Sequence, residues 1–106
     1  MQVQIRTDNH IEGTDAMAKW ASTTIKDALT RFSGQITRVE AHLSDLNGGK
    51  KNTAESIQCT MEARLEGHQP LAVKHLGANL NQAIEGGVEK LGRLIDSTLG
   101  RATAKV

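Results

Sequence analysis

The alternation of apolar and polar residues predicts four β-strands along the chain. The segments 2–6, 36–44 and 55–65 contain apolar side chains at every second position, at Val3 and Ile5, from Val39 to Leu43, and from Ile57 to Leu65. This period places them on one face of a strand. The third segment is the most regular, with apolar positions at Ile57, Cys59, Met61, Ala63 and Leu65. A fourth segment, 71–76, follows Pro70, which suits the first residue or the edge of a sheet. Its pattern leaves the register of this strand open.

Two further segments have the period of an amphipathic helix. Thr14 is expected to cap the first, and Ser33-Gly34 to end it with Gly34 in the left-handed conformation. The apolar stripe of this helix is predicted at Met17, Ala21, Ile25, Ala28 and Phe32. The second helix is expected to begin with a capping box formed by Asn79 and Gln82. Its stripe is predicted at Leu80, Ile84, Val88, Leu91 and Ile95.

The order of these elements, β-α-β-β-β-α, predicts an α+β fold. Because each strand has one apolar face and each helix one apolar stripe, both helices should pack on one face of a four-stranded sheet. The first helix should connect two parallel strands, and the later strands should form an antiparallel meander. Residues 1–106 are expected to form a single domain.

Composition narrows the kind of partner and the compartment. The 106 residues include 13 basic and 12 acidic side chains, for a net charge of +1, so any anion site must come from local arrangement. Trp20 and Phe32 are the only aromatic residues, which argues against a platform for stacking bases. One cysteine, no signal-peptide pattern and no run long enough to cross a membrane predict a soluble, cytoplasmic protein.

Catalytic and metal-binding patterns are not found. Cys59 falls at an inward strand position without an activating base, which is typical of a buried thiol. The four histidines, His10, His42, His68 and His75, lack the spacing of paired metal ligands. We therefore expect no enzyme activity, no cofactor, no metal and no small-molecule substrate. The loop tip Lys50-Lys51 is either a solvated turn or a basic finger that contacts phosphate.

The charges of the last helix are expected to be sorted around its axis. At about 100° per residue, Lys90, Arg93 and Arg101 fall on one flank and the outer surface, away from Glu85, Glu89 and Asp96. Lys19 and Lys26 occupy the outer side of the first helix. If the helices lie side by side, these five cations could line one positive strip that binds RNA phosphates. The alternative is a solvated surface whose charges happen to be sorted.

The chain resembles the ribosome hibernation-promoting factors, also called ribosome-associated translation inhibitors. The resemblance covers nearly the whole length and lies in the order and spacing of six segments: QVQIR, TDAMAKW, TRFSGQI, ITRVEAHLSD, IQCTMEARLEGHQPLAV and NLNQAIEGGVEKLGRLID. It implies a fold akin to double-stranded-RNA-binding domains. It also implies binding to the small ribosomal subunit in the mRNA and tRNA channel, and inhibition of translation under stress or in stationary phase.

This family uses basic residues of its helices against ribosomal RNA. Lys90 and Arg93, in the segment VEKLGRLID, match that pattern; Arg101 matches it less directly, and Lys19 and Lys26 lie on the corresponding first helix. The resemblance thus implies ribosomal RNA as the partner, and the absence of a membrane-spanning run predicts no membrane. The alternative function is a protein-interaction module with little RNA affinity, contacting a partner through the exposed sheet face.

Overall fold

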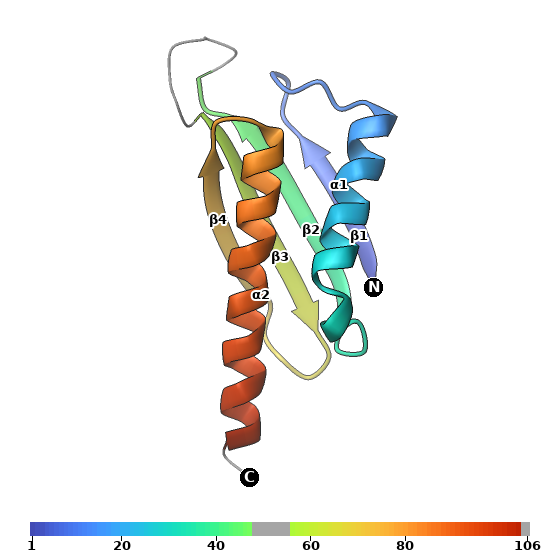
Figure 1. The fold of residues 1–106 in the computed structure, drawn as a ribbon, viewed down its shortest axis with the longest axis vertical. Helices are drawn as coiled ribbons and strands as arrows, with labels where there is room; N and C mark the ends of the chain where they lie inside the picture. Colours follow the sequence, from blue (N-terminus) through green and yellow to red (C-terminus); the bar gives the residue numbers. More distant parts are fainter. Residues whose placement is uncertain (48–55, 105–106) are drawn as a thin grey trace.

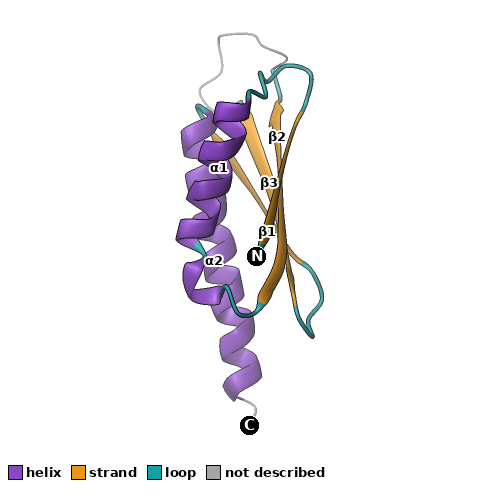
Figure 2. Ribbon diagram, turned by 90° about the vertical axis from the view of Figure 1, so that its right-hand side faces the viewer, coloured by secondary structure: helices purple, strands orange, loops and turns teal. Residues whose placement is uncertain are grey.

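The computed structural model describes residues 1–47 and 56–104, with side chains up to residue 100. The Lys50-Lys51 loop tip lies outside this part of the chain. Figure 1 shows the described elements in the predicted β-α-β-β-β-α order, and Figure 2 shows both helices on the same side of the sheet. The predicted α+β fold is therefore confirmed.

The sheet has the order β1-β2-β3-β4. Its strands are β1 (Gln2–Thr7), β2 (Ile36–Asp45), β3 (Ile57–Leu65) and β4 (Leu71–Gly77). β1 pairs in parallel with β2, whereas β2–β3 and β3–β4 are antiparallel, as the pattern predicts. β1 and β4 are thus the two edges.

The core fills the space between the sheet and the helices α1 (Asp15–Ala28) and α2 (Leu80–Ala104). In the described part of the chain every buried side chain is apolar, so the fold is held mainly by removal of apolar surface from water. Both helices and the two central strands contribute fully buried residues, among them Ala21, Ile25, Val39, Leu43, Cys59, Met61, Ile84, Leu91 and Ile95.

The end of the first helix differs from the prediction. α1 stops at Ala28, and a 3₁₀ turn, η1 (Thr30–Phe32), follows it. The hydroxyl of Thr30 donates to the backbone carbonyls of Lys26 and Asp27, which competes with regular helix hydrogen bonds. Leu29 is buried while Ala28 is exposed, so Leu29 belongs to the stripe in place of Ala28. Gly34 does not have a positive φ, and the left-handed cap predicted there is absent.

The structure resolves the register of β4 and its connections. Leu71, Val73 and His75 are half-buried, in alternation with the exposed Ala72, Lys74 and Leu76. In the β3–β4 turn, Gly67 has φ +80°, a conformation that favours glycine. At the end of β4, a Cβ on Gly77 would lie 2.5 Å from the backbone nitrogen of Ala83. The β4–α2 connection therefore requires a glycine at position 77.

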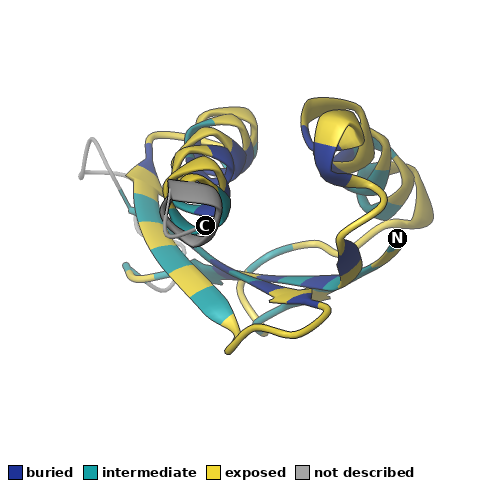
Figure 3. Ribbon diagram, turned by 90° about the horizontal axis from the view of Figure 1, so that it is seen from below, coloured by how far each residue is buried: buried dark blue, intermediate teal, exposed yellow. Residues whose placement is uncertain are grey.

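The face of the sheet opposite the helices is open. Figures 2 and 3 show no described helix or strand over it, and the exposed residues of the strands lie on this side. None of the helices in the described ranges combines the length and apolar character that crossing a bilayer requires. The protein thus presents two different polar surfaces, an outer helix surface and an open sheet face.

Candidate nucleic-acid interface

The N-terminus of α2 is fixed by the predicted capping box. The backbone N–H of Gln82 donates to Oδ1 of Asn79 at 2.9 Å, and the backbone N–H of Ala78 donates to Oε1 of Gln82 at 3.1 Å. The return bond therefore comes from the residue before Asn79, not from Asn79 itself. With Ile84, Leu91 and Ile95 buried below, the rotation of the helix is set, and so are the side chains that face outward.

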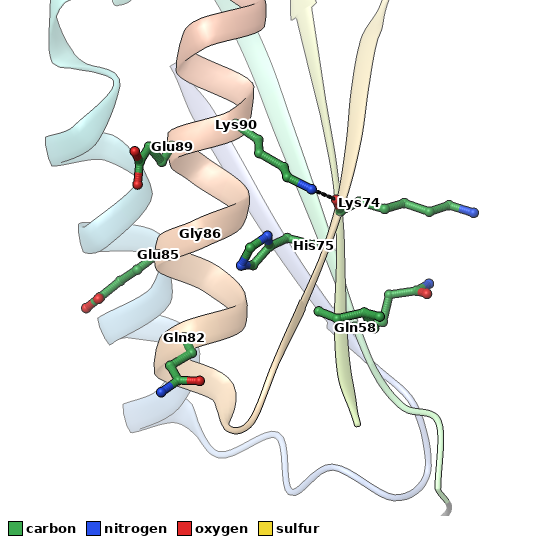
Figure 4. Close-up of a pocket in the computed structure, with 9 residues that line it drawn as sticks. Gln58, Lys74, His75, Gln82, Glu85, Gly86, Glu89 and Lys90 are labelled. Atoms are coloured by element: carbon green, nitrogen blue, oxygen red, sulfur yellow. Dashed lines mark hydrogen bonds between the residues drawn. The ribbon is translucent and has the colours of Figure 1, made fainter. Parts of the chain in front are cut away.

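Lys90 lies on the flank of α2 next to β4. Its Nζ donates to the backbone carbonyl of Lys74 at 2.9 Å, as Figure 4 shows. β4 is an edge strand, and an unpaired carbonyl at an edge is open to other chains. An ammonium group has three N–H donors, so two remain for a ligand. Lys90 thus has a structural contact besides any role in binding.

Arg93 does not lie apart from the acidic side chains of α2. Its guanidinium forms an ion pair with Glu89, one helical turn before it. The two positions differ by only about 40° around the axis, so the prediction of fully sorted charges is wrong here. Both side chains are well exposed, and such a pair contributes little to stability. The arginine remains accessible to an anion that can replace Glu89.

Lys19 and Lys26 face away from α2. The side of α1 next to α2 is marked by Ala28, which lines a groove of about 410 Å³ with Val88 and Gly92. Both lysines lie about 160–180° from Ala28 around the helix. They therefore do not join Lys90 in a single positive strip, and that part of the prediction is wrong. Arg101 lies in the last turns of α2, but its side chain is outside the described part.

Arg31 is a basic residue of this surface that the sequence pattern missed. In η1 it points toward α2, where its Nη2 lies 2.7 Å from Oδ2 of Asp96. Its guanidinium also lies 4.5 Å from the centre of the Phe32 ring. Arg31 and Arg93 line the same interhelical groove. Position 31 follows Ala28 by three residues, and that spacing could have placed it on the flank of α1 that faces α2.

The candidate catalytic and metal-binding residues are dispersed. Burial raises the pKa of the Cys59 thiol to about 11, which leaves it protonated and unreactive at neutral pH. His75 lies between β4 and α2, against Gly86 (Figure 4). Within residues 1–47 and 56–104 no three His, Cys, Asp or Glu side chains are grouped closely enough to hold a metal ion. The arrangement offers exposed cations for binding, and its thiol is not activated.

The described structure is a four-stranded sheet covered on one face by two helices that carry exposed cations. Residues 3–103 match the family described as Sigma 54 modulation protein / S30EA ribosomal protein. The chain belongs to this family, which makes it a ribosome-associated modulation protein and confirms the resemblance inferred from the sequence.

Solved structures agree with this fold. The N-terminal domain of Protein Y from Thermus thermophilus has 21% sequence identity and a TM-score of 0.72, covering 92% of this chain and 99% of that one. A ribosomal subunit interface protein from Coxiella burnetii has 11% identity and a TM-score of 0.69, covering 94% of this chain and 99% of that one. A comparison with curated protein sequences gives no significant match.

Proposed function

We propose that this protein inhibits translation by binding the small ribosomal subunit in the channel used by mRNA and tRNA, under stress or in stationary phase. The observation that carries the proposal is the match of residues 3–103 to the S30EA family. The proposal includes a cytoplasmic location and action by binding, without catalysis.

The outer helix surface carries the basic side chains that are needed to bind RNA phosphates. Lys90 keeps two N–H donors free. Arg31 and Arg93 are held by exposed carboxylates, and each guanidinium can exchange that carboxylate for a phosphate, which it binds in the same two-pronged geometry. Lys19 and Lys26 add a separate contact on the outer flank of α1. The proposed interface is therefore divided among three places, not concentrated in one strip.

Co-sedimentation with purified small subunits at two salt concentrations tests the proposal. With about three to five phosphate contacts, affinity should fall roughly ten- to hundredfold between 50 and 200 mM salt. Replacing Lys90 and Arg93 by glutamate should abolish binding while leaving the circular dichroism spectrum unchanged. Lys19→Glu with Lys26→Glu makes the same charge change on α1 and measures how much this flank of α1 contributes to the affinity.

The result that contradicts the proposed surface is unchanged sedimentation of both double variants. If the wild-type protein fails to bind small subunits even at low salt, the proposed function itself is wrong. A protein-interaction module would then be the better description.

A further inference from the structure

The surplus of positive charge is larger on the open sheet face than on the helices. Up to residue 100, α1, η1 and α2 carry five basic and five acidic side chains, so their charges balance, and Arg101 adds one positive charge to α2. The exposed and half-buried positions of the strands on the open face carry two carboxylates, Glu40 and Glu62, against four basic residues: Arg6, Arg38, Arg64 and Lys74. A polyanion would therefore be attracted to the sheet at least as strongly as to the helices.

The strand register arranges part of this charge in a line. Arg6 pairs with His42, His42 with Thr60, and Thr60 with Lys74. We call these four residues the basic row. It crosses the strands at right angles, and because neighbouring strands are about 4.8 Å apart, it extends over roughly 14 Å. Figure 4 shows the Lys74 side chain pointing away from α2, toward the open side.

The carboxylates next to the basic row are already neutralised. Glu40 lies opposite Glu62 in the register, but Arg38 binds Glu40 at 2.6 Å and Arg64 binds Glu62 at 3.3 Å. Within the described part of the chain, neither Arg6 nor the Lys74 ammonium has an ion-pair partner. A shallow hollow of about 270 Å³ lies between the carboxylates and the basic row. The row is thus the uncompensated charge of this face.

We propose that the open sheet face binds the sugar–phosphate backbone of RNA through the basic row. This contact would be a second one, opposite the helix surface, and it rests on the proposed ribosome-associated function. Arg6 and Lys74 would bind phosphates, while His42 and Thr60 supply hydrogen-bonding groups between them. The protein would accordingly be held by RNA on both of its faces.

The composition of the face favours RNA over a protein partner. Protein interfaces have apolar cores rich in aromatic residues, yet the only large exposed apolar residue of this face in the described chain is Leu76. Interfaces with nucleic acids are more polar and more positive. Since Trp20 and Phe32 lie on the helix side, this face has no aromatic residue for stacking bases. It is suited to the backbone, not to base recognition.

Fluorescence anisotropy with a labelled RNA duplex tests the sheet face without ribosomes. A duplex of about 20 base pairs is long enough, because a double-stranded-RNA-binding domain spans ~16. Arg6→Gln with Lys74→Gln should weaken binding roughly five- to tenfold per lost contact near 0.1 M salt. It should also lower the slope of log affinity against log salt by about 2. Glu40→Gln with Glu62→Gln should strengthen binding.

A matched control distinguishes the effect of the basic row on binding from the effect of net charge. Gln35→Glu with Gln69→Glu lowers the net charge by the same amount at exposed positions near the other end of the sheet, beyond a Debye length of about 8 Å at physiological salt. It should leave the salt slope unchanged. Equal losses in the control and in the Arg6/Lys74 variant, or no loss in the latter, would overturn the assignment.

A photo-cross-linking residue at His42 identifies what covers the face in the complex with small subunits. A cross-link to ribosomal RNA supports the proposal; a cross-link to a ribosomal protein, or none from bound protein, overturns it. Failure of the wild-type chain to bind subunits contradicts the proposed function instead, and the duplex titration still tests the sheet face.

Discussion

Replacing Gly77 by alanine should destabilise the protein, because the new methyl group has no room between β4 and α2. Its Cβ would lie 2.5 Å from the backbone nitrogen of Ala83 and 2.9 Å from the carbonyl carbon of Gln82. Backbone atoms of a capped helix cannot rotate aside as a side chain can, so the first turn of α2 must shift. Overpacking of this kind costs about 1–3 kcal/mol. At about 4–8 °C per kcal/mol, a loss of 2 kcal/mol lowers the Tm by about 8–16 °C.

Two other glycines provide the comparison. A Cβ on Gly34 meets nothing within 4 Å, so Gly34→Ala should raise the Tm slightly by restricting the unfolded chain. At Gly86 the Cβ would lie 2.0 Å from Nε2 of His75, but that ring can turn away, and the loss should be smaller than at Gly77. Thermal unfolding followed by circular dichroism gives the three Tm values. Equal values for Gly77→Ala and Gly34→Ala would refute the steric argument.

Two titratable groups give further predictions. Cys59 should resist alkylation in the native state at neutral pH and react once the protein is unfolded in denaturant, as mass spectrometry would detect; fast native labelling would contradict its burial. Desolvation raises the pKa of Asp8, but hydrogen bonds from the backbone N–H groups of Asp45 and His10 outweigh it, so the pKa lies below its ordinary 3.8. The stability from this contact is present above the unfolded-state pKa and is lost as the pH falls through the lowered folded-state value. Asp8→Asn should therefore destabilise the protein at neutral pH and least at strongly acidic pH, and equal effects at both would be inconsistent with this contact.

The alternating strands and the stripe of α2 could be predicted because the spacing of apolar residues along the chain determines which face of each element is buried. Strand β3 and the residues Ile84, Leu91 and Ile95 occupy the expected positions. The end of α1 could not be read in the same way. Whether the Thr30 hydroxyl bonds to preceding carbonyls depends on its rotamer, and the 3₁₀ turn that follows changes the residues that face the core.

The interface was harder to predict than the fold. Arg31 and Asp96 are 65 residues apart, and no periodicity within either helix indicates their contact. Arg93 and Glu89 are close in sequence, but a coarse division of the helix into two flanks put them on opposite sides. The basic row needs the register of all four strands, since Arg6 and Lys74 lie at its two ends and are aligned only through His42 of β2 and Thr60 of β3.

The bond from Lys90 to the Lys74 carbonyl is also expected to hinder self-association through β4. An extended segment of another molecule could add to the edge of β4 by pairing with its outward-facing backbone groups. The Lys90 ammonium occupies one of these groups near the middle of the strand. Any event that draws Lys90 away, a bound phosphate or a substitution, also opens that edge. Variants of Lys90 should therefore also be centrifuged without subunits, so that self-associated protein in the pellet is not counted as ribosome binding.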